Sequence, residues 1–190
     1  MSCITAKRSI VICRQLIGSF AFLIGLMGLV FADETPKSLR ELDQAIDKYL
    51  MKKVGSVAAA GAPTGDAQVW CMRQYQAALK QPDSEKLILR ILYSHLKKAN
   101  QLAQSTDVKV RRSALAMRLE AAKSAAAHLK DKWLVAKICD AYLLPHLADC
   151  HPSNSEPLSM EDVLSTLIYC YKTAGDDKGY LAGYKLSLLH

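Results

Sequence analysis

The chain is poor in the residues and patterns that build sheets. Aromatic residues make up only 7% of its 190 residues, and it contains 9 glycines and 6 prolines. No stretch alternates apolar and polar residues with a period of two, which is the pattern of a half-buried strand. Hydrophobic residues nevertheless make up 51% of the chain, and most of them are Leu, Ala, Ile and Val. This composition predicts an all-α protein with a sizeable core.

The chain also lacks the short motifs of common enzyme classes. It has no G-x-S-x-G nucleophile elbow, no H-E-x-x-H zinc motif, no P-loop and no dinucleotide-binding fingerprint. The acidic pair Asp176-Asp177 lies at a predicted turn, where helix capping accounts for it. Because no group of residues converges on catalysis, we expect neither an enzyme nor a bound cofactor.

Acidic residues are missing from the first 32 positions, where the only charges are Lys7, Arg8 and Arg14. An uncharged apolar run over 16–31 follows, and residues 30–32 offer a cleavage site after Ala32. This order is typical of a Sec-type signal peptide, so we predict a secreted or periplasmic protein. The alternative is an uncleaved, single-pass membrane anchor, although a 16-residue helix spans only ~24 Å of the ~30 Å hydrocarbon core.

The net charge of +7 belongs partly to this leader. Removing its three cations from the 25 Lys and Arg leaves 22 against 18 acidic residues, or +4. So small an excess is weak support for a nucleic-acid partner, and we predict none. We expect a protein or peptide partner, and membrane contact only through an uncleaved N-terminal segment. Six basic residues on two neighbouring predicted helices are expected to form a solvated face, the alternative being a basic patch for an acidic partner or anionic lipid. They are Lys97, Lys98, Lys109, Arg111, Arg112 and Arg118.

Hydrophobic periodicity divides the rest of the chain into a helix, a linker and a helical domain. The segment 33–54 contains an amphipathic helix from residue 36, with Asp43 and Asp47 expected on its solvent face. Residues 55–66 (GSVAAAGAPTGD) have no period and predict a flexible linker. The domain over 67–190 should contain six helices, at about 67–80, 84–104, 108–130, 132–144, 159–174 and 176–190.

These six helices form three successive pairs with short turns. The pairing predicts antiparallel helical hairpins stacked side by side as a repeat-like bundle, behind the N-terminal signal helix. The last pair resembles a tetratricopeptide repeat. The helix-A pattern of that family is met by Leu164, Leu167, Ile168 and Tyr171, the turn by Gly175-Asp176, and helix B by Tyr184 and Ser187.

The resemblance covers about thirty residues and has departures. Tyr180 replaces the small residue that the family carries early in helix B, and a step of 34 residues back from Tyr171 reaches Lys137 rather than a second match. Many hairpins of amphipathic helices would meet part of the pattern. The resemblance implies an interaction or scaffold module whose groove binds a peptide or a partner helix.

Four cysteines follow the predicted cleavage site, namely Cys71, Cys139, Cys150 and Cys170. An even number in an exported chain permits two disulfides with three possible connectivities. Cys150 lies in a predicted loop, where a bond to Cys139 or to Cys170 is open. The alternative is that Cys71 and Cys170, which lie on apolar helix stripes, are small core residues.

A metal-binding module is a second hypothesis for the same loop. Cys139, His146, Cys150 and His151 offer the soft ligands that zinc and copper prefer. Their spacing is not that of an established zinc finger or metalloenzyme, so we predict no metal and an exposed loop. His95 lies on an apolar stripe and is expected to be a hydrogen-bonded core histidine.

Overall fold

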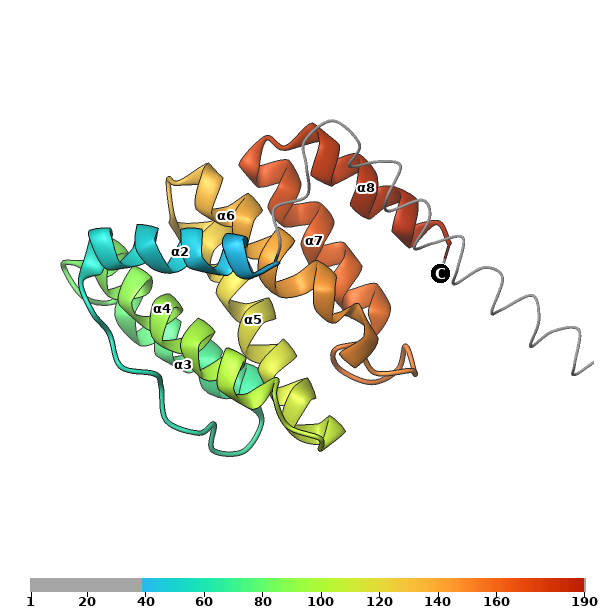
Figure 1. Ribbon diagram of the computed structural model, residues 1–190, viewed down its shortest axis with the longest axis horizontal. Coiled ribbons are helices and arrows are strands. Elements are labelled where there is room, and N and C mark those ends of the chain that lie inside the picture. The colour runs from blue at the N-terminus through green and yellow to red at the C-terminus, as the bar shows by residue number, and fades with distance from the viewer. Residues whose placement is uncertain (1–38, 190) are drawn as a thin grey trace, which may run out of the picture. The chain divides into compact units, whose positions relative to one another are not determined.

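The computed structural model describes residues 39–189, and in this range the chain is all-helical, as predicted, with no strand. Figure 1 shows the helices packed as a bundle. The predicted signal helix and the cleavage site at Ala32 lie outside the described residues. No helix within 39–189 is long and apolar enough to cross a membrane. The α-helices are α2 (Leu39–Val54), α3 (Ala67–Leu79), α4 (Ser84–Leu102), α5 (Val108–His128), α6 (Lys132–Ile138), α7 (Met160–Ala174) and α8 (Asp177–Ser187).

Polar caps fix where these helices begin. The side chain of Asp66 accepts hydrogen bonds from the backbone N–H groups of Gln68 and Val69, at 2.8 and 3.0 Å. Ser159 and Asp162 form the predicted capping box, because each side chain accepts from the backbone N–H of the other. Such bonds satisfy N–H groups that have no partner in the first turn of a helix. Asp107, Asp131 and Asp176 cap three further helices in the same way.

Helix α5 forms the centre of the bundle and contacts α3, α4, α6 and α7. Nearly every residue from 114 to 126 is buried, and many of them are alanines. Small side chains let neighbouring helix backbones approach closely, which explains how four helices pack around one. Figure 1 shows α5 running between the α3–α4 side of the molecule and the α6–α7 side.

The helix expected over 132–144 is α-helical only as far as Ile138. It continues as a π-helix, η1 (Cys139–Leu143), in which the Leu144 N–H reaches the carbonyl oxygen of Cys139. A 3₁₀-helix, η2 (Leu144–Asp149), follows. It includes the first residues of the segment predicted to be a loop. The wider π turn changes which neighbours its side chains meet. Asp140 contacts Tyr171 on α7, whereas Tyr142 contacts Asp43 on α2.

Helix α2 packs on α4, α6 and η1, and Figure 1 shows it lying across them. Its buried side chains are Ile46 and Leu50. The following segment, predicted as a flexible linker over 55–66, contains no helix. It is held against α4 at two points, because the Ala60 N–H donates to the Ser94 carbonyl at 3.2 Å and Lys97 Nζ donates to the Val57 carbonyl at 3.2 Å.

Candidate functional site

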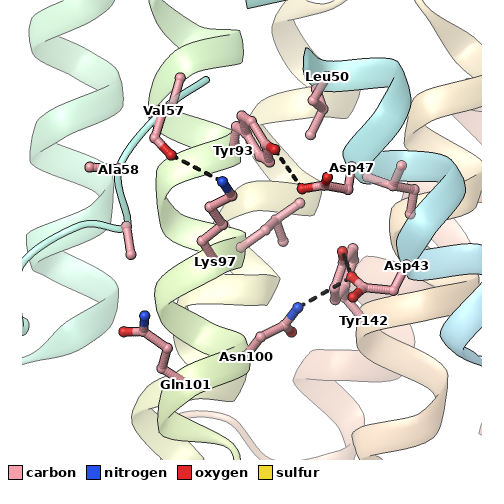
Figure 2. A pocket seen from close by; sticks show the side chains of 13 residues that line it. Asp43, Asp47, Leu50, Val57, Ala58, Tyr93, Lys97, Asn100, Gln101 and Tyr142 are labelled. Atoms are coloured by element: carbon pink, nitrogen blue, oxygen red, sulfur yellow. Dashed lines mark hydrogen bonds between the residues drawn. The ribbon is translucent and has the colours of Figure 1, made fainter. Parts of the chain in front are cut away.

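A hollow of about 400 Å³ lies between α2, α4, η1 and the segment 57–59. Figure 2 shows acidic side chains entering it from α2 and a lysine reaching the opposite wall. Tyr93 Oη donates a hydrogen bond of 2.5 Å to Asp47 Oδ1. Asp43 Oδ1 accepts two bonds, one from Tyr142 Oη and one from Asn100 Nδ2 at 3.2 Å. These bonds join α2 to α4 and to η1.

The expected solvent-facing position of these two aspartates is therefore wrong. Asp43 and Asp47 are half-buried and lie on the same side of α2 as Ile46 and Leu50, since positions three and four apart share a helix face. Partial burial of a carboxylate is tolerated when donors surround it. Tyr93, Tyr142 and Asn100 supply those donors, and all three come from distant parts of the sequence.

The tyrosine hydroxyls are held protonated by this arrangement. Burial, followed by the hydrogen bond to Asp47, raises the pKa of Tyr93 well above its ordinary value of 10.0. Burial and the hydrogen bond to Asp43 do the same to the pKa of Tyr142. A buried phenolate beside a carboxylate would bring two negative charges together, so both hydroxyls remain donors.

A buried cation lies behind this hollow. Arg118 Nη2 donates to Asn100 Oδ1 at 3.0 Å, and its guanidinium lies 5.9 Å from the centre of the Tyr142 ring. Burial lowers the pKa of Arg118 to about 10, so the side chain is still charged at neutral pH. Asn100 thus connects the guanidinium to the Asp43 carboxylate, because it accepts from one and donates to the other.

Lys97 supplies the positive charge on the wall formed by segment 57–59. Its Nζ lies 4.4 Å from the centre of the Tyr93 ring while it donates to the Val57 carbonyl. The hollow is thus polar and carries charges of both signs, but most of its polar groups already bond to one another. We interpret it as the seam that fixes α2 and segment 57–59 to the bundle.

A second hollow, of about 350 Å³, crosses α3, α5 and α7. Two of its lining side chains share a partner, because Gln68 Nε2 donates to Glu120 Oε1 at 3.0 Å and Lys123 Nζ donates to the same oxygen at 3.1 Å. The loop before α7 forms one rim, where Leu158 has a left-handed backbone (φ 63°). This hollow is called the groove below. Its lining residues are Gln68, Leu119, Lys123, Pro157, Leu158, Asp162, Ser165 and Thr166.

Exposed apolar side chains extend the groove along two of its helices. Met72 lies four residues after Gln68 on α3, and Tyr169 lies four residues after Ser165 on α7, so each shares a helix face with a groove residue. Helix-binding grooves bury large apolar anchors and use a few polar groups for orientation, and this part of the surface has side chains of both kinds.

The structure does not bring the candidate metal ligands together. Among residues 39–189 no group of three or more His, Cys, Asp or Glu side chains could hold a metal ion. Cys139 is buried as the first residue of η1, His146 Nδ1 lies 3.6 Å from Asp149 Oδ2, and His151 Nδ1 accepts from the Ser153 N–H at 3.2 Å. Burial lowers the pKa of His146.

All four cysteines behind the predicted leader are free thiols here. Cys71 is buried on α3, where burial raises its pKa to about 12. Cys150 is half-buried after η2, and burial raises its pKa to about 11. Cys139 and Cys170 are both fully buried, and the neighbouring Cys170 thiol, followed by burial, raises the pKa of Cys139.

The prediction for His95 is confirmed. Its side chain is buried against the rings of Trp70 and Tyr75, and Nε2 bonds to Gln74 Oε1 at 3.2 Å. The basic residues, by contrast, do not form one solvated face. Arg118 is buried, and Arg111 Nε pairs with Asp149 Oδ1 at 2.8 Å.

In comparisons with protein-family models, curated proteins and solved structures, nothing matches this chain. The candidate sites therefore depend on geometry alone. Sequence reasoning missed both hollows, although one signal was present. Asp43 and Asp47 interleave with Ile46 and Leu50 on α2, and an acidic pair within an apolar stripe indicates buried hydrogen-bond donors opposite.

Proposed function

We propose that this chain is an exported helical-repeat scaffold that binds a peptide or a partner helix in the groove across α3, α5 and α7. The observation that carries this proposal is the groove itself, which combines a hollow of about 350 Å³ with polar lining groups and neighbouring exposed apolar side chains. Protein-binding grooves on helical folds use this combination of an apolar contact surface and a few orienting polar groups.

The packing of the helices supports a stack of hairpins. In sequence order, α3 contacts α4, α5 contacts α6, and α7 contacts α8. The first helices of successive pairs also contact each other, since α5 packs against both α3 and α7. In a repeat protein each unit contacts mainly its neighbours, and the first helices of the units line one common face. The groove lies on that face.

The last hairpin supports the likeness to a tetratricopeptide repeat. A Cβ on Gly179 would lie 2.3 Å from Cδ1 of the Tyr171 ring, so α8 approaches α7 as closely as it does only because residue 179 is a glycine. The family pattern has a small residue where this chain has Tyr180. Gly179 thus supplies a small residue one position earlier. Gly175, at the turn, has the left-handed backbone (φ 69°) that favours glycine.

Export is the part of the proposal that rests on sequence alone. The cations, apolar run and small residues of positions 7–32 support a cleaved leader. Sequencing the N-terminus of the protein from its native host tests this part, and we expect it to begin at Asp33. A protein that begins at Met1 would contradict cleavage and favour the membrane-anchored alternative.

Site-specific photocrosslinking tests the groove. Tyr169 on α7 and Tyr184 on α8 form a matched pair, because they are 49% and 47% exposed and only Tyr169 shares a face with groove residues. A photoreactive phenylalanine analogue would replace each tyrosine in the full chain, expressed in the native host. We expect discrete protein adducts with the probe at 169 and few or none with the probe at 184.

A charge change inside the groove provides the second arm of this experiment. Lys123→Glu places a second carboxylate beside Glu120, which should weaken binding and reduce the adducts formed at position 169. Circular dichroism shows whether the variant is folded. Equal adducts at 169 and 184, or adducts at 169 that persist unchanged in folded Lys123→Glu, would contradict the groove as the binding site.

A further inference from the structure

Cys139 and Cys170 lie on two elements that pack against each other, since Cys139 begins η1, Cys170 lies on α7 and η1 contacts α7. The neighbouring Cys170 thiol, followed by burial, raises the pKa of Cys139 well above its ordinary value. Both side chains are 0% exposed. No cysteine is among the groups that shift the pKa of Cys71 or of Cys150. Of the connectivities that the sequence leaves open, the fold therefore favours the one that pairs Cys139 with Cys170.

An independent contact fixes the same two turns against each other. The residues that follow the two cysteines also meet, because Tyr171 Oη donates to Asp140 Oδ1 at 2.7 Å. Tyr171 is itself buried and packed against Gly179 of α8. Both α6 and η1 contact α7, so the helices run side by side at this point. The surrounding fold thus holds the turn that carries Cys139 against the turn that carries Cys170, and a disulfide requires such proximity because its geometry is narrow.

We propose that Cys139 and Cys170 form a structural disulfide in the exported protein, joining η1 to α7. This disulfide proposal rests on the export part of the proposed function, because disulfides form and persist in oxidising compartments. The bond spans 31 residues of sequence and links the second predicted hairpin to the third. It therefore ties α7, one of the helices that line the groove, to η1.

The oxidant is a disulfide-bonded donor, such as glutathione disulfide or a thiol oxidoreductase. One cysteine loses its proton and attacks a donor sulfur, which gives a mixed disulfide and releases one donor thiolate. The second cysteine loses its proton and attacks the mixed disulfide, which closes the Cys139–Cys170 bond and releases the second donor thiolate. The two cysteines lose two electrons in total, and the donor takes up those electrons and two protons as it becomes a dithiol or two thiols.

Burial determines when this exchange occurs. Fully buried thiols are neither accessible to a donor nor readily ionised, and the thiolate is the reactive form. The bond should consequently close during folding, while both sulfurs are still exposed. Once closed, it should resist reductants as long as the bundle stays folded. Oxidation of the already folded dithiol should be slow by comparison.

Oxidative refolding of the full chain tests the pairing. The reduced chain is unfolded in guanidinium, diluted into a buffer of oxidised and reduced glutathione, alkylated, digested and mapped by mass spectrometry. We expect a linked peptide that contains Cys139 and Cys170, with Cys71 and Cys150 alkylated. We also expect the folded, reduced chain in the same buffer to form the bond at least tenfold more slowly. No linked peptide, or a dominant bond that includes Cys150, would overturn the proposal.

Thermal unfolding gives a second readout that does not depend on peptide mapping. The oxidised chain should unfold about 10 °C above the reduced chain, as a disulfide closing a loop of this length implies. Cys139→Ala should abolish the difference between oxidised and reduced samples, whereas Cys71→Ala should keep it. A difference that persists in Cys139→Ala would contradict the pairing.

Failure of this proposal is distinguishable from failure of the proposed function. The refolding experiment reports the bond whether or not the groove binds anything, and photocrosslinking reports the groove whether or not the bond forms. Trapping the thiols by alkylation in intact cells of the native host adds a measure of export. We expect the bond in cells that carry the full leader and its loss when residues 2–32 are deleted; a bond that is absent in both would overturn its assignment to the exported protein.

Discussion

The two faces of helix α4 differ in how completely their buried polar groups are hydrogen-bonded. On the face toward α2, Tyr93, Lys97 and Asn100 all have hydrogen-bond partners, and these join four separate segments. On the face toward α3, His95 has a partner for Nε2 only. Its Nδ1 and the nearby Tyr75 hydroxyl have no hydrogen-bond partner among residues 39–189.

The two faces therefore contribute to the stability of the fold in different ways. A partnered hydrogen bond stabilises the fold by a modest amount, and leaving one of its groups unsatisfied costs more. The hydrogen bonds on the face toward α2 therefore hold α2 in place. Removing them should lower the free energy of unfolding. The face toward α3 is buried and aromatic, and the burial of His95 there makes the fold sensitive to protonation instead. Four predictions test this comparison, beginning with the largest effect.

Acid should destabilise the bundle through His95. Burial lowers the pKa of His95 to about 4 from its ordinary value of 6.5. As the pH falls, the unfolded chain therefore binds this proton before the folded chain does. The contribution of neutral His95 is complete above pH 6.5 and is lost as the pH falls toward 4, with a total of about 3 kcal/mol.

Urea unfolding of wild type and His95→Gln at several pH values between 7.5 and 4.5 checks this effect. The variant should show a much shallower fall in the free energy of unfolding, because glutamine does not titrate. His146, whose pKa burial also lowers, contributes to the fall in both proteins. A variant at the exposed His128, His128→Gln, should keep the wild-type slope. Equal slopes in wild type and His95→Gln would refute the role of His95.

Removal of the carboxylate at the seam should have the next largest effect. Asp43→Ala leaves the Tyr142 hydroxyl and the Asn100 amide without their shared acceptor. We expect the free energy of unfolding to fall by about 2 kcal/mol. Gln44→Ala, at an exposed position on the same helix, is the control and should change it little. Chemical denaturation measures both, and similar small losses would show that the seam does not hold α2.

Loss of a single partnered hydroxyl should cost less. Tyr93→Phe removes the donor to Asp47 but keeps the ring beneath Lys97. The expected loss is about 1 kcal/mol in the free energy of unfolding. Lys97→Met in the same background should then show how far the cation still contributes. A Tyr93→Phe protein as stable as wild type would show that this bond is made equally well to water in the unfolded chain.

The matching change on the other face should have the smallest effect. Tyr75→Phe removes a buried hydroxyl that has no hydrogen-bond partner among the described residues, so the folded state loses no bond. We expect stability to stay within about 0.5 kcal/mol of wild type or to rise slightly, because the cost of burying the hydroxyl disappears. A loss as large as that of Tyr93→Phe, measured by the same denaturation, would break the comparison.

Much of the fold could be predicted because its signals are local. The positions of α3, α4, α5 and α7 follow from apolar periodicity, and their starts follow from residues such as Asp66 and Ser159. The expected helix over 132–144 is confirmed in its extent, but its second half is a π-helix rather than an α-helix. The hydrogen bond of a π turn spans one residue more than that of an α turn, and neither composition nor periodicity marks that difference clearly.

The sites were much harder to predict, because they depend on contacts between distant residues. Tyr142 lies 99 positions from the aspartate that it bonds, and Asn100 lies 57 positions from the same side chain. The groove draws its lining from three helices and a loop. Pairings over such separations follow from how helices stack, and one sequence does not encode that stacking in any short window.

By itself, the sequence determined that this protein is helical and where most helices begin, and it provided the signals from which a leader is predicted. Hydrophobic periodicity and capping act within a few residues, so they can be read from a single chain. Only the tertiary structure decided that Asp43 faces inward, that η1 with Cys139 packs on α7 with Cys170, and that α3, α5 and α7 share a groove. The physical reason is that close packing brings together side chains that no local rule relates.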